Sequence, residues 1–221
     1  MTERGGHSIL RSAAALGLVA IIGTALLTLV HHLTAEQIAA EERRVIQQQL
    51  GQILPIESYD NALLDDRFSF KNEAWFPRGQ TVTAYRARKQ GQPVAVILRF
   101  KAVDGYNGDI QILAGIHTDS SLSGVRVISH KETPGLGDAI EAEKSDWVLD
   151  FNGKSLPGTV PGEWAVKKDG GEFDQFTGAT ITPRAVVNAV RSALEFFESS
   201  EKYLFDAPSD LNTDMNRNEN S

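Results

Sequence analysis

The spacing of apolar and polar residues first marks a long uncharged run near the N-terminus. Residues Ser12 to Val30 carry no charge and are mostly apolar. As a helix, such a run is about 28 Å long at 1.5 Å per residue, close to the roughly 30 Å hydrocarbon core of a bilayer. The pattern therefore predicts a single transmembrane anchor over residues 12–33.

Two other interpretations of this run stay open. A cleaved signal peptide has a shorter apolar region, about 7 to 15 residues, and a small-x-small cleavage site, which His31-His32-Leu33 does not supply. A buried helix of a soluble domain is the third interpretation. The length of the run, and the lack of a cleavage site in the residues that follow it, favour the uncleaved anchor.

The flanking charges predict an orientation for the anchor. Arg4 and Arg11 precede the run and Arg11 adjoins it, whereas Arg43 and Arg44 lie well beyond it. Basic residues next to a span tend to stay on the cytoplasmic side. We therefore expect residues 1–11 in the cytoplasm and the rest of the chain on the periplasmic side of a bacterial inner membrane.

Polar residues prevail on both sides of the predicted globular domain. Over residues 34–55, a few apolar residues at imperfect helical spacing lie among Glu, Arg and Gln, which predicts a stalk helix that ends near Gly51. The domain is expected over residues 56–205. The tail, residues 206–221, is polar and free of aromatic residues, so it is predicted to be disordered.

Within the domain, the period of apolar positions becomes that of β-strands near Thr81. A series of strand-like runs follows, and Lys89-Gln90-Gly91-Gln92 between the first two is a hairpin signal. Together the runs predict an antiparallel sheet. They are Thr81–Arg88, Pro93–Phe100, Asp109–His117 and Gly124–His130.

Helical periodicity follows the strands. A short helix is predicted over Ala139–Val148 and a long one over Thr182–Tyr203. The apolar residues of the long helix fall on one side, so it should pack against the sheet. The expected fold is α+β, with a single N-terminal transmembrane helix followed by one domain in which helices pack on an antiparallel sheet. The apolar positions of the long helix are Val186, Val187, Val190, Leu194 and Phe197.

Composition and charge narrow the function classes. The formal net charge is −7 with no basic stripe to offset it, so nucleic-acid binding is not expected. The chain has no cysteine, which excludes disulfides, iron–sulfur clusters, thiolate metal sites and covalent haem. His117 and His130 lack a second ligand at metal spacing, so no metal site is predicted. Any redox chemistry must use another cofactor.

The segment that leads into the long helix carries candidate chemistry. Asp174 to Thr182 reads Asp-Gln-Phe-Thr-Gly-Ala-Thr-Ile-Thr and runs into Pro183. Proline suits the first helical position, and Thr182 suits the cap before it. Thr180 is then expected near the positive dipole end of a helix, where an anion is stabilised by roughly 0.3 to 1 kcal/mol per charge. An ordinary helix-entry turn, with a positive φ at Gly178, explains the same residues.

Two glycine-containing loops accompany the strands. Gly105-Tyr106-Asn107-Gly108 precedes the third strand and is also the composition of a plain turn. Glu132-Thr133-Pro134-Gly135-Leu136-Gly137 follows the fourth strand. A Pro-Gly-x-Gly loop exposes backbone amides with few side chains in the way, which suits close approach of a planar ligand or a phosphate.

These segments together resemble a known family. The pattern Asp-x-x-Thr-Gly-Ala-Thr over Asp174–Thr180 resembles the flavinylation motif of the FMN-binding subunits in bacterial Rnf and sodium-pumping NADH:quinone reductase complexes. In that family the final threonine of the motif carries FMN through a phosphoester, so the resemblance implies covalent FMN at Thr180. Thr182 is the near alternative. The resemblance extends from the anchor to about Phe205.

The resemblance also implies a set of cofactor contacts, because the family's Glu-Thr-Pro-Gly-Leu-Gly loop lies against the flavin. Lys167 is expected to place positive charge near the phosphate or the ring, although a surface lysine is more often merely solvated. No catalytic or metal-binding residue is implied. The implied cofactor-binding residues are Thr177, Gly178, Ala179 and Thr180 of the motif, Glu132, Thr133, Leu136 and Gly137 of the second loop, Tyr106 of the first loop, and Lys167.

By this resemblance the chain is a membrane-anchored flavoprotein subunit that relays electrons within a complex coupling electron transfer to ion translocation. A threonine hydroxyl is a weak nucleophile, and no adjacent His or Cys activates Thr180. Self-attachment is therefore not expected, and the family implies a flavin transferase that uses FAD. The other expected partners are the remaining subunits of the complex and membrane lipid.

Two alternatives to this function stay open. The C subunits of the sodium-pumping complex share the motif and the anchor, although the short chain and the Lys-Lys-Asp-Gly-Gly approach to the motif look more like Rnf G subunits. The alternative from another class is a membrane-anchored binding or assembly protein of the cell envelope, in which Thr180 is unmodified.

Overall fold

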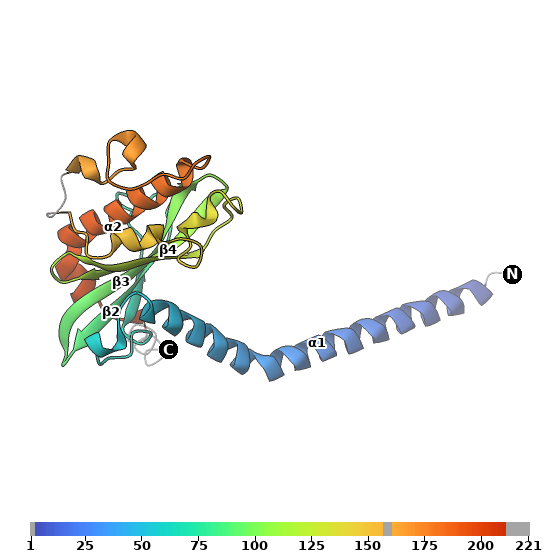
Figure 1. Ribbon diagram of the computed structural model, residues 1–221. Coiled ribbons are helices and arrows are strands. Elements are labelled where there is room, and N and C mark those ends of the chain that lie inside the picture. The colour runs from blue at the N-terminus through green and yellow to red at the C-terminus, as the bar shows by residue number, and fades with distance from the viewer. Residues whose placement is uncertain (1–2, 157–160, 211–221) are drawn as a thin grey trace. The chain divides into compact units, whose positions relative to one another are not determined.

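The computed structural model describes the backbone of residues 3–156 and 161–210, and their side chains except at 3–15, 19, 29–33, 36, 39 and 161. The chain divides into two units, residues 1–46 and residues 47–221. Helix α1 (Glu3–Gly51) supplies the described part of the first unit, and the second unit contains the sheet and helix α2 (Ile181–Asp206) (Figure 1).

An antiparallel sheet of five strands forms the centre of the second unit. The strand order is β1-β2-β3-β4-β5, so each strand pairs with its neighbour in sequence. The predicted hairpin is confirmed: Lys89 pairs with Gln92, and Gln90 and Gly91 have positive φ angles of 52° and 76°, as a two-residue turn of type I′ requires. The strands are β1 (Arg67–Phe70), β2 (Val82–Lys89), β3 (Gln92–Gly105), β4 (Gly108–His117) and β5 (Leu122–Ser129).

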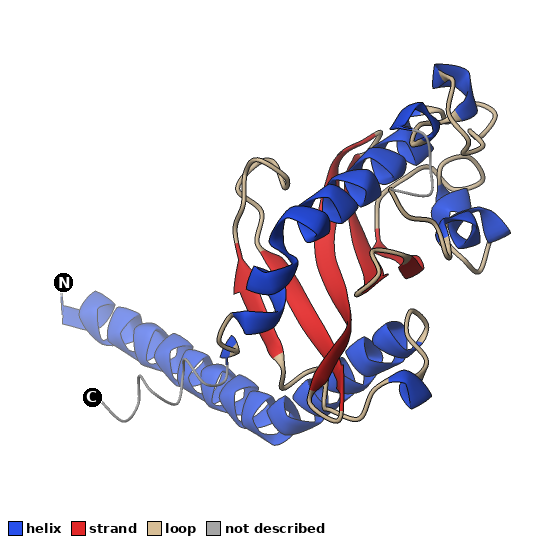
Figure 2. Cartoon of the chain, turned by 90° about the vertical axis from the view of Figure 1, so that its left-hand side faces the viewer, coloured by secondary structure: helices blue, strands red, loops and turns tan. Residues whose placement is uncertain are grey.

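Helix α2 lies across one face of the sheet, chiefly over β3 (Figure 2). The apolar stripe predicted for this helix is confirmed, because its side chains are fully buried. Burying one such side chain is worth roughly 1.5–3 kcal/mol, so this stripe holds the helix on the sheet. The α+β class is therefore confirmed for the second unit. The stripe consists of Val186, Val187, Val190, Leu194 and Phe197.

The helix predicted over Ala139–Val148 is wrong. Two 3₁₀ turns occupy this region, η2 (Asp138–Ile140) and η3 (Asp146–Phe151). The hydroxyl of Ser145 donates to the carbonyl of Ala139 at 2.6 Å and accepts the N–H of Trp147 at 3.2 Å, so a side chain takes the place of helical backbone partners. The remaining 3₁₀ turns are η1 (Ile56–Ser58), η4 (Pro161–Glu163) and η5 (Lys167–Asp169).

Helix α1 includes residues 34–51 of the segment predicted as a stalk, and it ends at Gly51. Among the side chains that the structure describes, no helical segment has the length and apolar character needed to span a bilayer. The predicted anchor, residues 12–33, lies partly outside those side chains, at 12–15, 19 and 29–33. Described apolar residues of the run, such as Leu16 and Leu27, are exposed.

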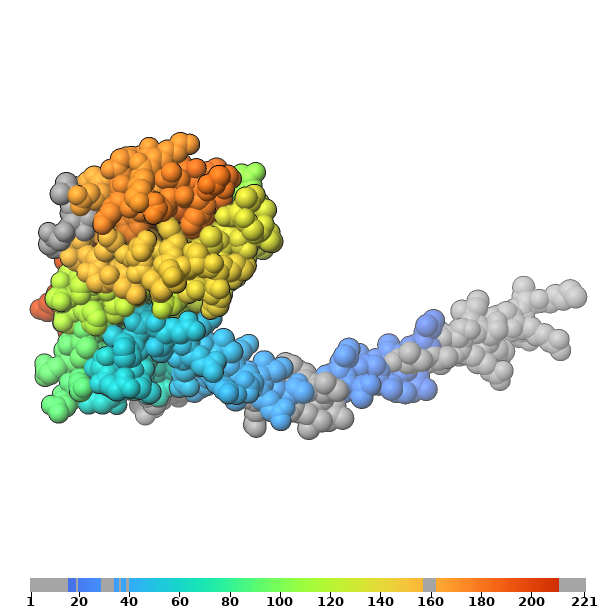
Figure 3. Space-filling view, in the orientation of Figure 1, coloured from blue at the N-terminus to red at the C-terminus, as the bar shows by residue number. Residues whose placement is uncertain are grey.

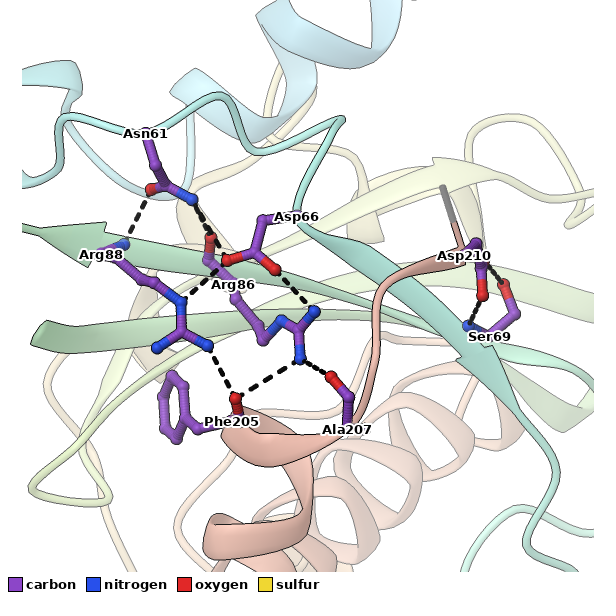
Figure 4. Close-up of polar contacts among 8 residues, drawn as sticks. All are labelled: Asn61, Asp66, Ser69, Arg86, Arg88, Phe205, Ala207 and Asp210. Carbon is purple, nitrogen blue, oxygen red and sulfur yellow. Dashed lines mark hydrogen bonds and ion pairs between the residues drawn. The ribbon is translucent and has the colours of Figure 1, made fainter. Parts of the chain in front are cut away.

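A buried polar cluster joins the C-terminal end of α2 to β2 (Figure 4). Arg86, whose side chain is 3% exposed, pairs with Asp66 at 2.6 Å and also donates to the carbonyls of Phe205 and Ala207. Arg88 binds the same aspartate at 2.8 Å and the carbonyl of Phe205 at 2.6 Å. Because the last carbonyls of a helix lack intrahelical partners, the two guanidinium groups satisfy them and oppose the negative end of the helix dipole.

The tail after α2 is ordered over its first residues. The carboxylate of Asp210 accepts hydrogen bonds from the N–H and the hydroxyl of Ser69, each at 3.2 Å, on the edge strand β1 (Figure 4). Ser209 is buried. The predicted disorder is therefore wrong for residues 206–210, and residues 211–221 lie outside the described part of the chain.

Candidate functional site

Three segments that are distant in sequence meet at a cavity of about 360 Å³. They are the β3–β4 hairpin, the loop after β5, and the turn that leads into α2. Figure 3 shows the orange surface around the start of α2 directly against the yellow surface of the loop after β5. The volume lies at the lower end of the range for small-molecule sites, roughly 300–1,000 Å³. The lining residues are Tyr106, Glu132, Thr133, Leu136, Gly137, Gly178, Ala179, Thr180, Ile181 and Thr182.

A tight turn delivers Thr180 to this cavity. The N–H of Ala179 donates to the carbonyl of Phe176 at 3.1 Å, and Gly178 takes a φ of 83°. Only glycine adopts this left-handed conformation without steric cost, which explains its place in the turn. The positive φ expected at Gly178 is confirmed.

The cap of α2 lies two residues before the predicted one, and the helix begins one residue before the predicted range. The helix begins at Ile181, so Thr180 is its capping residue and Thr182 and Pro183 lie within its first turn. The expected cap at Thr182 is wrong. Proline is tolerated throughout the first turn, because the first N–H groups of a helix have no intrahelical partner. A proline in the sequence therefore does not identify the first residue of the helix.

The two candidate threonines lie in different environments. Thr180 is partly exposed at the cavity wall, and its side chain makes no capping hydrogen bond. Thr182 has no exposed surface, and its hydroxyl donates to the carboxylate of Glu132. Of the two hydroxyl groups, only that of Thr180 is both accessible and uncommitted to this carboxylate.

A polar network supports the loop after β5 from behind. Asp138 accepts the N–H of Gly135 at 2.8 Å, and the Lys144 ammonium lies 2.8 Å from both Asp138 and Glu141. Hydrogen bonding to Lys144 lowers the pKa of both carboxyls, and Asp138 in turn raises the pKa of Lys144. All three groups are therefore charged at neutral pH, and the network holds the Pro-Gly-x-Gly loop in place.

His130 completes this support. One ring nitrogen, Nε2, lies 2.7 Å from Glu141, and the other, Nδ1, accepts the N–H of Glu132 at 3.0 Å. A larger polar cavity of about 570 Å³ opens on this side of the loop, and among its charged side chains Lys144 pairs with both Asp138 and Glu141. We therefore place the candidate site in the smaller cavity.

Side chains from outside the motif fix the approach to Thr180. The indole N–H of Trp147 donates to the carbonyl of Asp174 at 2.8 Å, and the ring packs edge-on against Phe176 with centroids 5.2 Å apart. Arg184 of α2 forms a bidentate pair with Asp169 at 2.6 and 2.9 Å. The hydrogen bond from Arg184 lowers the pKa of Asp169, so this pair persists at neutral pH. The turn is thus held from both sides.

Two predicted contacts do not reach the cavity. Thr177 is exposed in the turn and is absent from the lining. Lys167 is 54% exposed and pairs with Asp174 at 2.6 Å, which directs its ammonium to that carboxylate. The other predicted residues all line the cavity.

The chemistry of the lining fits a planar cofactor that carries a phosphate. Tyr106, Leu136 and Ile181 are large apolar residues that remain 66%, 46% and 45% exposed around this one cavity. A flat ring would cover such surface. The N-terminal end of α2 favours an anionic group beside Thr180. The residues present therefore fit FMN.

Sequence reasoning missed two features of this wall. Ile181 lines the cavity, and the available sequence signal was an apolar residue beside Thr180 that is not part of the apolar stripe of the long helix. The bond between Thr182 and Glu132 has no local signal, because the partners are 50 residues apart in sequence.

Comparison with known proteins agrees with these features. Residues 105–195 match the family model described as FMN-binding domain, and residues 1–53 match the model described as RnfG N-terminal region. Together the matches include the segments that line the cavity.

Similar curated proteins cover nearly the whole chain, and each of the following is named as the G subunit of an ion-translocating oxidoreductase complex. The chain is 44% identical to the protein of Shewanella loihica, over 91% of this chain and 95% of that protein. It is 48% identical to the protein of Pseudomonas aeruginosa, over 90% and 92%. It is 42% identical to the protein of Vibrio cholerae, over 91% and 96%.

Proposed function

Because the chain belongs to the family of G subunits of ion-translocating oxidoreductase complexes, we propose that it carries FMN and relays electrons within such a complex. The observation that carries this proposal is the cavity in which the predicted segments converge on the accessible hydroxyl of Thr180. The proposed partners are the other subunits of the complex.

We further propose that FMN is bound covalently through Thr180. In the transfer, the Thr180 oxygen attacks the flavin-side phosphorus of FAD, the phosphoanhydride bond breaks, AMP leaves and the hydroxyl proton is released. The threonine needs an external catalyst, because the described cavity lining contains no histidine or lysine to take this proton and the one carboxylate, Glu132, is bonded to Thr182. A flavin transferase is therefore the proposed maturation partner.

Each wall of the cavity has a separate task in this proposal. Gly178 and the first turn of α2 leave room and positive potential for the phosphate. Leu136 and Tyr106 would cover the ring, and the loop backbone at Gly137 would lie beside it. The bound FMN would accept and release electrons singly or in pairs. The protein would set the reduction potential of the flavin through burial, hydrogen bonding and charge.

The covalent proposal predicts flavin that survives unfolding. Protein expressed with the transferase, denatured and separated on a gel, should show a band that fluoresces under ultraviolet light, and its mass should exceed that of the bare chain by FMN less one water. Expression without the transferase gives the matched control, which should be dark. A dark band from both hosts would contradict covalent attachment and favour the alternative, a membrane-anchored binding protein without covalent flavin.

We also propose that residues 12–33 anchor the chain in the inner membrane with the FMN domain on the periplasmic side. The support is the uncharged run Ser12–Val30 and the basic Arg11 before it. The protein should remain in the membrane fraction after extraction with alkaline carbonate, whereas a variant with Leu18, Ile22 and Leu26 changed to Lys should be released, since each charge at a helix centre costs about 2.5–3.5 kcal/mol on insertion scales. Release of the unaltered chain would contradict the anchor.

A further inference from the structure

We propose that Glu132 is the positioning residue that assembles the flavin attachment site and determines which threonine is modified. This inference rests on the proposed attachment at Thr180 and adds a role that the cofactor-contact prediction did not contain. The carboxylate acts through its neighbours, by fixing the first turn of α2 against the two glycine loops.

The contacts of Glu132 join all three walls of the cavity. The residue belongs to the loop after β5 and is 4% exposed. One carboxylate oxygen, Oε1, accepts the backbone N–H of Asn107 in the β3–β4 hairpin at 2.9 Å. The other, Oε2, accepts the hydroxyl of Thr182 in the first turn of α2. Both oxygens are thereby committed to protein donors.

The two glycine loops leave room for this carboxylate. A Cβ atom on Gly105 would lie 3.0 Å from Glu132 Oε1 and 2.3 Å from the carbonyl of Gly108. A Cβ atom on Gly137 would lie 3.0 Å from both the Cβ of Glu132 and the hydroxyl oxygen of Thr182. Gly105 is therefore required by the close Gly108 carbonyl, and any larger residue at Gly137 would press on Glu132 and Thr182.

Glu132 also lines two cavities. It lines the candidate flavin cavity, and it lines the larger polar cavity behind the loop. Its backbone N–H is held by His130 on that second side. Glu132 thus links the candidate flavin cavity to the supporting network, to which its main chain is bonded through His130.

The same contacts divide the roles of the two threonines. Glu132 binds the hydroxyl of Thr182, which is fully buried, and so withdraws that hydroxyl from any transferase. Thr180, two residues earlier, is left at the cavity wall.

Amide hydrogen exchange on the full-length chain without flavin tests the positioning role directly. Glu132→Ala removes both bonds, so the amides of residues 184–187, the first of α2 with a carbonyl partner four residues earlier, should exchange about ten-fold faster or more, since about 1.4 kcal/mol corresponds to a factor of ten. Glu132→Gln can accept the N–H of Asn107 and donate to Thr182, and exchange should stay within about two-fold of the wild type. Glu143→Ala, which removes an exposed carboxylate nearby, is the matched control and should leave exchange unchanged.

Flavin transfer from FAD by the purified transferase gives the second measurement. The initial rate should fall about ten-fold or more for Glu132→Ala and recover with Glu132→Gln, and peptide mass spectrometry should detect FMN on Thr182 only in the alanine variant. If Glu132→Ala does not fold, Thr182→Val, which removes a single bond, should give an intermediate rate while Thr182→Ser retains the wild-type rate.

The outcomes separate this inference from the proposed function. An unmodified wild-type chain overturns covalent attachment, and the exchange measurement still decides whether Glu132 holds the helix end. A modified wild type with unchanged exchange and rate in Glu132→Ala overturns the positioning role alone. Equal losses in the glutamine and alanine variants also overturn it, because glutamine preserves the pairing.

Discussion

Thr180→Val should eliminate covalent flavin completely while leaving the fold intact. Valine keeps the branched shape of threonine and removes only the hydroxyl that would form the phosphoester. The hydroxyl of Thr180 makes no capping hydrogen bond, so its loss should change stability by little. The measurement is the intact mass of protein expressed with the transferase, together with fluorescence of the unfolded band.

The neighbouring hydroxyl groups supply the controls for this result. Thr177→Val removes an exposed hydroxyl of the same turn that does not line the cavity, and flavin should be retained. Thr182→Ser keeps the bond to Glu132 and should also retain it. Persistence of the flavin mass in Thr180→Val, with loss in Thr182→Val, would transfer the attachment to Thr182.

Asp66→Ala should cause the largest loss of stability, about 3 kcal/mol or more in the free energy of unfolding. The substitution leaves the buried guanidinium of Arg86 without its counter-charge, and breaking a buried pair from one side typically costs about 3–5 kcal/mol. The carbonyls of Phe205 and Ala207 still accept from Arg86, which places the expectation at the lower end. Chemical denaturation of the purified chain, followed by circular dichroism, measures the change.

An exposed ion pair provides the comparison. Asp109 pairs with Lys101 at 3.1 Å, and both side chains are about 40% exposed. Asp109→Ala should therefore cost no more than about 1 kcal/mol. Adding Arg86→Met to Asp66→Ala should recover part of the loss, because it removes the unpaired buried charge. Equal effects of Asp66→Ala and Asp109→Ala would show that the cluster does not secure α2.

The regular elements were predictable where one physical rule dominates. The stripe of α2 follows from helical period alone, and burial of Val186, Val190 and Leu194 confirms it. The hairpin at Gln90-Gly91 follows from turn chemistry. The region around Ser145 was mispredicted because a side-chain hydroxyl displaced the helical hydrogen bonds that periodicity assumes.

Long-range polar contacts were not predictable from the sequence. Arg86 has the alternating position of an ordinary strand residue, and its burial depends on the end of α2, which lies more than a hundred residues later. Asp210 was assigned to a disordered tail because local composition gives no sign of the hydrogen bonds to Ser69. In both cases the partner is supplied by the tertiary fold.

The candidate site, too, was predicted only in part. Resemblance brought Thr180, Leu136 and Tyr106 into one hypothesis, and the structure places all three at one cavity. It also nominated Lys167, whose ammonium is paired with Asp174 instead. Family membership is confirmed by the similarity to G subunits of ion-translocating oxidoreductase complexes over about nine-tenths of the chain. The cofactor roles of the individual residues stay predictions.

The strand order has a consequence for the timing of maturation. Every strand pairs with the next one along the chain, so the sheet assembles from local hairpins as the polypeptide emerges. Thr180, the proposed acceptor, by contrast, lies at the start of helix α2, whose first turn is bonded to the much earlier Glu132. A growing or truncated chain would therefore acquire its scaffold before the proposed modification site, so the completed domain is the form that the proposed transferase should recognise.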